Sequence, residues 1–264
     1  MKRLLVETAS LWVLAALLCC VSVPVTHRKA LNLVPYEKEV ALGEQAYRAI
    51  LSKEPLSGNA RWTALLRRVG KNIAQVSDTP HLEWEFNLLN SKRINAFCLP
   101  GGKVAVYTGI MPLAKNEAGL AAIIGHEVAH AVARHAAERM SQTLLVEVGL
   151  GLADLSLQNS TYRDIILASL GLGAQVGVLL PYSRQHEKEA DEIGIHYMAR
   201  AGYDPGEAVR LWERFSQQEA GRSPEFLSTH PASPKRVEAL RALLPQAERE
   251  YQRAPRRYGL GEAL

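Results

Sequence analysis

The chain has 264 residues, of which 47% are apolar and 22% charged, and its formal net charge at pH 7 is +4. This length and apolar content suffice for one well-packed catalytic domain preceded by a leader. The basic residues are dispersed and no nucleic-acid-binding motif occurs, so we expect no nucleic-acid partner.

The first residues predict a targeting segment. Lys2 and Arg3 precede an uncharged run that ends at Thr26, and a basic triplet follows it. A hydrocarbon core needs about 20 residues to cross, so residues 1–27 are expected to be a signal peptide or a single-span anchor. We therefore expect export to a bacterial cell envelope, with a periplasmic domain that is either free or anchored by this segment.

Cysteine usage agrees with an exported domain. Cys19 and Cys20 suggest a lipoprotein site, but Leu18 stands where Gly, Ala or Ser is required, so lipidation is the less favoured alternative. Beyond the leader only Cys98 remains, and no internal disulfide can form.

The next segment predicts two helices and a small antiparallel sheet. Amphipathic patterns predict helices over residues 36–51 and 62–77. Apolar residues alternate over residues 82–88, which predicts a half-buried strand. Residues 94–99 and 103–108 flank a Pro-Gly-Gly turn and predict a hairpin. The edge of such a sheet can bind an extended peptide as an added strand.

The most informative stretch is His126-Glu127-Val128-Ala129-His130. On a helix, positions i and i+4 share a face, so both imidazoles point at one spot, and zinc accepts neutral imidazole readily. Glu127 lies beside that spot, where it can take a proton from zinc-bound water. The neighbouring residues are mostly apolar, so the helix is expected to be buried and its polar groups need a partner such as a divalent cation. Asn116 is the expected N-cap.

Two apolar, glycine-rich runs follow, over residues 144–155 and 165–180. The second run is short for a membrane span and contains Gln175. We predict a soluble helical hairpin that covers the active site, or one that dips into a membrane, in preference to a transmembrane pair.

A third ligand is expected from a helix over residues 183–200. Glu187 and Asp191 share a face, so Glu187 can reach the metal while Asp191 accepts the outer ring N–H of a ligating histidine. Glu189 points the other way and is expected in solvent. His135 follows His130 by five residues and is expected on the surface or beside the site rather than on the metal. The other histidines are expected to be solvated or core residues: His27, His81, His186 and His196.

The C-terminal part predicts two more helices. One starts at Asp204 and ends near Gln218, and another opens at Ser233, with a loop over residues 223–232 between them. Residues 28–248 are thus expected to form the domain, and residues 249–264 a frayed basic tail.

Three motifs in this order resemble the HtpX/BepA-type zinc metallopeptidases. They are HEVAH at 126–130, SRQHEKEAD at 183–191, and STHP at 228–231 with Arg236 after it. That family also contains the CAAX-prenyl protease and the mitochondrial inner-membrane stress protease. Residues 95–104 are similar to the family's lead-in to the zinc helix, and the likeness runs from about Glu37 to Leu244.

The resemblance implies an α+β, mainly helical, zincin-like (gluzincin) domain with one Zn²⁺ per chain. It implies His126, His130 and Glu187 as the ligands and Glu127 as the general base. From its relatives, the resemblance implies that His230 is either a fourth ligand that closes the site or a group that steadies the transition state.

The resemblance also assigns supporting residues. Asp191 would orient His126, and Arg236 would hold Asp191 or the loop that carries His230. Three residues of the hairpin are the expected substrate-binding group: Asn95, Ala96 and Phe97.

We therefore expect a zinc-dependent endopeptidase of the cell envelope that cleaves misfolded or unassembled proteins. Its expected partners are unfolded or extended polypeptides and a membrane surface. The alternative is a latent metallopeptidase that acts as a chaperone-like binding module, with its zinc site closed by His230.

Overall fold

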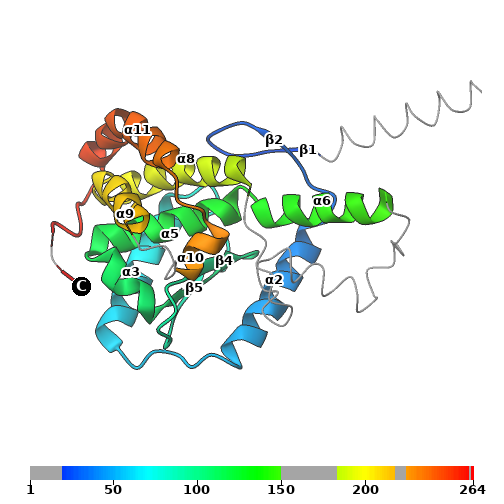
Figure 1. The fold of residues 1–264 in the computed structure, drawn as a ribbon, viewed down its shortest axis with the longest axis horizontal. Coiled ribbons are helices and arrows are strands. Elements are labelled where there is room, and N and C mark those ends of the chain that lie inside the picture. The colour runs from blue at the N-terminus through cyan, green and yellow to red at the C-terminus, as the bar shows by residue number, and fades with distance from the viewer. Residues whose placement is uncertain (1–19, 150–182, 218–223, 262) are drawn as a thin grey trace, which may run out of the picture.

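The computed structural model describes residues 20–149, 183–217, 224–261 and 263–264. It is mainly helical with two small sheets, which confirms the predicted fold class (Figure 1). The elements in chain order are β1 (Cys20–Ser22), β2 (Lys29–Leu31), α2 (Tyr36–Leu51), α3 (Ala60–Val76), β3 (Glu85–Leu89), β4 (Ala96–Leu99), β5 (Lys103–Tyr107), η1 (Thr108–Ile110), α4 (Met111–Ala114), α5 (Glu117–Val132), α6 (His135–Gly149), α8 (Arg184–Arg200), α9 (Gly206–Ser216), α10 (Glu225–Thr229) and α11 (Pro234–Arg253).

The central strand β5 is buried along its whole length because helices cover both faces of its sheet. Val104 and Val106 belong to the larger core, which contains residues of α3, α5 and α8. Ala105 and Tyr107 belong to a second core with residues of α2 and α6. A strand covered on both faces is apolar without alternation, as β5 is.

The sheet is mixed, with strand order β3-β5-β4. The predicted hairpin is confirmed, because β4 and β5 pair antiparallel with Phe97 opposite Ala105. However, β3 pairs with β5 in parallel, with Glu85 opposite Lys103, so the sheet is not antiparallel throughout. The strand expected over residues 82–88 is present, but it is shifted and almost fully buried rather than half-buried. Strand β3 begins later, at Glu85, and contributes to both cores.

Most of the predicted helices are present with small shifts. Helix α2 has the predicted bounds, whereas α3 begins before Trp62 because Asn59 Oδ1 accepts a hydrogen bond from the Trp62 N–H at 3.0 Å. The predicted hairpin over 144–180 lies largely outside the described residues; its first residues, to Gly149, end α6. Within the described ranges, none of the helices is both long and apolar enough to cross a bilayer.

Both ends of the described chain pack on the domain. Strand β1 lies within the predicted leader, yet it pairs antiparallel with β2, and Val23 between them is buried in the larger core; residues 1–19 lie outside the described part. The C-terminal tail is not frayed as expected. The Tyr258 N–H donates to the Gly202 carbonyl at 2.8 Å, and the Leu264 N–H donates to the Lys115 carbonyl at 3.2 Å.

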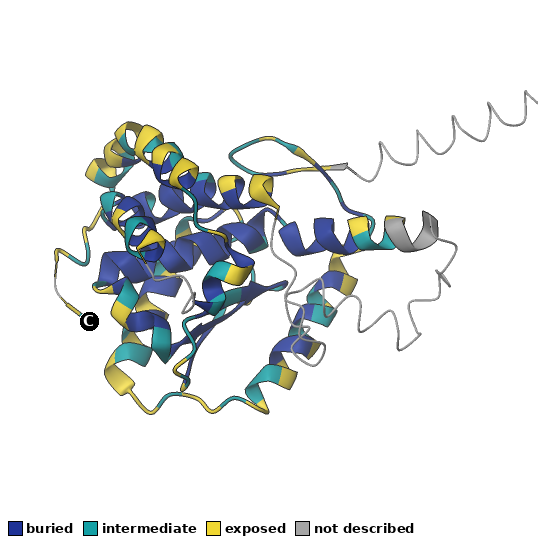
Figure 2. Ribbon diagram, in the orientation of Figure 1, coloured by how far each residue is buried: buried dark blue, intermediate teal, exposed yellow. Residues whose placement is uncertain are grey.

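Helices α5 and α8 make the most extensive contact in the fold, and α5 is buried along most of its length (Figure 2). They approach closely where Gly125 faces Gly194. A Cβ on Gly194 would lie 2.9 Å from the backbone nitrogen of His126, closer than real Cβ atoms approach. The absence of side chains at these two positions therefore sets the distance between His126 and the acidic residues of α8.

Replacing Gly194 by Ala should lower the free energy of unfolding. The added methyl meets backbone atoms, so α5 and α8 must separate, which costs about 1–3 kcal/mol. This cost exceeds the gain of up to about 1 kcal/mol from the better helix propensity of Ala. Urea unfolding of the metal-free protein measures the difference. Gly58→Ala is the control, because nothing lies within 4 Å of its Cβ. Equal midpoints for Gly194→Ala and the parent protein would contradict this account of the crossing.

Candidate metal centre

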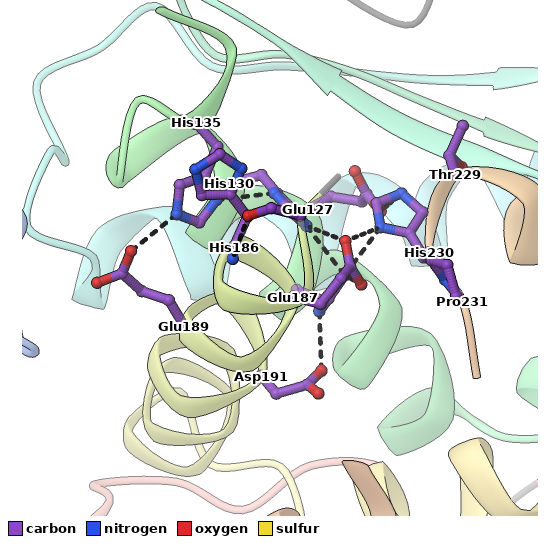
Figure 3. A network of polar contacts seen from close by, with 12 residues as sticks. Glu127, His130, His135, His186, Glu187, Glu189, Asp191, Thr229, His230 and Pro231 are labelled. Carbon is purple, nitrogen blue, oxygen red and sulfur yellow. Dashed lines mark hydrogen bonds and ion pairs between the residues drawn. The ribbon is translucent and has the colours of Figure 1, made fainter. Parts of the chain in front are cut away.

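Four side chains converge at the centre of the fold. His126 and His130 come from α5, Glu187 from α8, and His230 follows α10 directly. One ligand atom from each lies within 4.8 Å of all the others, and all four residues are buried. Figure 3 shows three of them, His130, Glu187 and His230, close together. The two helices start at well-defined caps. Asn116, as predicted, accepts from the Gly119 N–H at 2.8 Å, and Ser183 accepts from the N–H of residue 186.

The separations between these atoms fit a tetrahedral metal ion. His126 Nε2 lies 3.1 Å from His130 Nε2, 3.2 Å from His230 Nδ1 and 3.4 Å from Glu187 Oε2. Glu187 Oε1 lies 3.4 Å from His130 Nε2 and 3.0 Å from His230 Nδ1. Ligands about 2.1 Å from one zinc ion stand about 3.4 Å apart at tetrahedral angles. Three imidazoles and one carboxylate are also donors that zinc prefers, so these residues can hold it.

Glu127 lies beside this cluster rather than in it. Its Oε1 is 3.5 Å from His230 Nε2 and has no hydrogen-bond partner in the described part of the chain. Burial raises the pKa of Glu127, and the charges of His230 and His126 only partly oppose this rise. A carboxyl group with a raised pKa can hold a proton for part of a reaction cycle and then release it.

Arg236 joins the two acidic residues of α8. Its Nε and Nη2 donate to the two oxygens of Asp191, both at 2.7 Å, and its Nη1 lies 2.6 Å from Glu187 Oε2. Asp191 Oδ1 in turn lies 3.1 Å from His126 Nδ1. Burial alone would raise the pKa of Asp191, but Arg236 and His126 outweigh it and the pKa is lowered. Arg236 also donates to the Pro231 carbonyl at 3.1 Å, so it contacts both Asp191 and the loop that carries His230.

A second polar cluster lies against the first, and the sequence analysis missed it. Glu189 is 4% exposed, so the expectation that it is solvated is wrong. The hairpin β1–β2 covers this face of α8, and Arg28 from that hairpin donates to Glu189 Oε2 at 2.7 Å. Burial alone would raise the pKa of Glu189, but hydrogen bonds from His135, Arg28 and Thr26 hold it at about 2.

His135 is fully buried in this second cluster, beside the site rather than on the surface. Its ring nitrogens lie 2.9 Å from His130 Nδ1 and 3.0 Å from Glu189 Oε2. The ring of His186 stacks on that of His135 with centroids 4.4 Å apart, and His186 Nε2 lies 3.1 Å from Glu138 Oε2. The only feature of the sequence that pointed to His135 was its spacing of five residues from His130. Nothing in the sequence indicated Arg28.

The expected substrate-binding residues lie at the edge of the sheet, on and just before β4. The Asn95 carbonyl accepts from the Tyr107 N–H at 3.1 Å, and Ala96 faces the larger core. The Phe97 side chain packs on the second core, on the opposite face of the sheet from α5. Strand β4 is an edge strand of the described sheet, but the Asn95 carbonyl is already paired with β5 and the Phe97 ring lies on the face away from α5.

Comparisons with known proteins agree with this geometry. Residues 60–244 match the sequence profile of Peptidase family M48. The chain is 40% identical to mitochondrial metalloendopeptidase OMA1 of Schizosaccharomyces pombe over 86% of this chain and 67% of that protein. It is 32% identical to mitochondrial metalloendopeptidase OMA1 of Homo sapiens over 85% of this chain and 46% of that protein. It is 28% identical to the beta-barrel assembly-enhancing protease of Escherichia coli over 76% of this chain and 42% of that protein.

The comparisons also correct one prediction. Relatives named as mitochondrial are 32–40% identical to this chain, whereas the bacterial relatives are 28% identical. The expectation of a periplasmic protein of a bacterial cell envelope is therefore wrong. The match over most of the chain, together with the converging histidine and glutamate side chains, settles the family: the chain belongs to peptidase family M48 and is a metalloendopeptidase of that family.

Proposed function

We propose that the protein is a zinc-dependent endopeptidase that holds one zinc ion per chain with His126, His130 and Glu187 and cleaves unfolded or extended polypeptides. The observation that carries the proposal is the convergence of these three side chains on one buried point with Glu127 beside it. A purely structural site needs no such neighbouring carboxylate and usually contains Cys ligands. The names of the more similar relatives favour a mitochondrial setting, and misfolded or unassembled proteins are the proposed substrates.

Each residue has a distinct part in the proposed reaction. When bound, zinc acts as a Lewis acid that polarises the scissile carbonyl and makes water more acidic. Glu127 accepts the proton of the attacking water and passes it to the leaving amine, for which its raised pKa suits it. Asp191 accepts the Nδ1–H of His126 and so keeps the Nε2 lone pair of that ring directed at the metal.

The edge of β4 is the proposed guide for the substrate backbone. Among the described strands β4 pairs with β5 alone, and it packs against α5, which carries His126 and His130. An extended polypeptide could pair along the outer edge of β4, next to Asn95, Ala96 and Phe97, and so present its carbonyl to the site. The backbone N–H of Cys98, on the same strand, contacts the carboxylate of Glu127 and places the base beside this edge.

Replacing Glu127 by Gln should abolish proteolysis while zinc remains bound. The amide cannot accept the proton, so cleavage of unfolded casein should fall at least about 10²–10⁴-fold. Zinc content measured by atomic absorption should stay the same, because Glu127 is not among the proposed ligands. Glu192→Gln, on the partly exposed side of α8, is the matched control and should cleave casein normally. Persistent cleavage of casein by Glu127→Gln would contradict the assignment of Glu127 as the general base.

The alternative, a latent enzyme closed by His230, has a specific observation in its favour. His230 Nδ1 lies close enough to Glu187 and His126 to take the fourth position of the cluster. The four residues of the cluster are at most 4% exposed, so this conformation leaves no room for a polypeptide at the site. On this alternative, the protein binds unfolded chains and cleaves them only when the segment with His230 moves away.

Replacing His230 by Ala separates the two possibilities. If His230 is a lid, the rate of casein cleavage should rise. The expected factor is about one divided by the fraction of parent molecules in which the segment with His230 has moved away. If His230 instead stabilises the transition state, cleavage should fall by about 10²-fold or more. Ser228→Ala is the control, because Ser228 lies on the same segment but is exposed. An unchanged rate in His230→Ala would contradict both roles.

Zinc binding should strengthen as the pH rises to about 9. Burial alone would lower the pKa of His126, but its contacts with Asp191 and Glu187 raise it to about 9 in the metal-free protein. This proton stabilises the folded metal-free protein below pH 6.5, and the contribution is lost as the pH rises through 9. Zinc must displace the proton, so its dissociation constant should fall about tenfold per pH unit below that value.

Competition with a chelator of known proton affinity, at several pH values, measures this dependence. Asp191→Asn should flatten it, because the neutral amide no longer favours the protonated ring. A zinc affinity that does not change with pH in the parent protein would contradict the proposed protonation of His126.

A further inference from the structure

We infer that Arg28, Glu189 and His135 form a positioning relay that fixes His130 for metal binding, an inference that rests on the proposed function. His130 Nδ1 lies 2.9 Å from His135 Nδ1, and His135 Nε2 lies 3.0 Å from Glu189 Oε2 (Figure 3). Arg28 Nε and Nη2 then donate to the same Glu189 oxygen at 2.8 and 2.7 Å. The chain of contacts thus runs from α5 through α6 and α8 to the hairpin β1–β2.

The direction of each hydrogen bond in the relay follows from the Glu189 carboxylate at its outer end. The Glu189 carboxylate, paired with Arg28, can only accept, so the hydrogen on His135 lies on Nε2. A neutral His135 then offers the lone pair of Nδ1, and His130 must donate to it from its own Nδ1. The Nε2 lone pair of His130 is left facing His126 and Glu187, which is the tautomer that a metal ligand requires.

The two proposed histidine ligands are supported in parallel ways. Asp191 lies directly on Nδ1 of His126, and Arg236 holds Asp191. On His130, the corresponding position is taken by His135, which carries the contact outward to Glu189 and Arg28. His126 is thus connected to the carboxylate of Asp191 and through it to Arg236. His130 is connected through His135 to the carboxylate of Glu189 and through it to Arg28.

Arg28 is the anchor of the relay. Its guanidinium also donates to both oxygens of Glu138 on α6, at 3.0 and 2.8 Å, so it bridges two buried carboxylates. Thr26, on the same hairpin, adds a hydroxyl hydrogen bond to Glu189. Removing the guanidinium would leave these carboxylates without their cation, and Glu189 would be free to turn away from His135. Docking of the hairpin β1–β2 is therefore part of the assembly of the metal centre.

The test measures zinc dissociation constants of the full chain by competition with a chelator. His135→Leu keeps about the same volume but removes the acceptor for the Nδ1–H of His130 and the donor to Glu189 Oε2, so zinc should bind about 10–100-fold more weakly. His135→Gln can still accept from His130 through its oxygen and donate to Glu189 through its amide. Its zinc affinity should therefore stay within about tenfold of the parent protein. A residue that only fills space would not show this difference between Leu and Gln.

A second pair of variants tests the anchor. Arg28→Gln should weaken zinc binding about tenfold or more, although Arg28 does not touch the metal ligands. Arg134→Gln is the matched control, because Arg134 also pairs with a buried carboxylate, that of Glu39, at 2.8 Å. The two arginine side chains are similarly exposed, at 17% for Arg28 and 19% for Arg134. Arg134→Gln should bind zinc like the parent protein.

The outcomes separate the relay from the proposed function. A parent protein that binds no zinc would overturn the proposed function itself. If the parent protein binds one zinc per chain and Arg28→Gln, folded by circular dichroism, binds it equally well, the relay is wrong. Equal weakening by Arg134→Gln and Arg28→Gln would also overturn it, because the effect would then be one of general stability. Arg28→Gln decides the matter even if His135→Leu does not fold.

Discussion

The contact between α5 and α8 brings together imidazole and carboxylate groups that would be unfavourable in a protein interior without a polar partner. Helix α5 supplies buried imidazoles and helix α8 supplies buried carboxylates, and the close approach at Gly125 and Gly194 leaves them only hydrogen-bond distances apart. Each group alone would pay a large desolvation cost on burial. Together they form a network of paired charges, and within the described part of the chain His126, His130, Glu187 and His230 bring their ligand atoms to a point that fits a cation.

The positive charges of this network come from elements that pack around the helix pair. Arg236, on α11, holds Asp191 and Glu187, and its guanidinium lies 3.5 Å from the ring centroid of Trp212. Arg28, on the N-terminal hairpin, holds Glu189 and Glu138. Because a buried carboxylate that loses its cation destabilises a fold by about 3–5 kcal/mol, these outer elements stabilise the folded state as well as the site. Stability and metal-site geometry therefore depend on the same contacts.

The sequence predicted the parts of the site that follow from local spacing. The geometry of a helix places residues i and i+4 on one face. The sequence therefore predicted that His126 and His130 share a face of one helix, and that Glu187 and Asp191 share a face of another. The position of Glu189 could not, because its surroundings depend on a hairpin more than 150 residues away, as its contact with Arg28 shows. Likewise, local alternation could not reveal that β3 runs parallel to β5, since strand order depends on how the chain returns. Both errors concern contacts between distant parts of the chain, which local sequence patterns do not encode.

The segment that carries His230 covers two parts of the site at once. The Phe226 N–H on α10 donates to the Ile94 carbonyl at 2.9 Å, beside the edge where β4 begins, and His230 sits on the metal cluster. The same segment is held by Arg236, which donates to the Pro231 carbonyl while it neutralises Asp191 and Glu187. A displacement of this segment that takes His230 away from the cluster would therefore also free the Ile94 carbonyl beside β4.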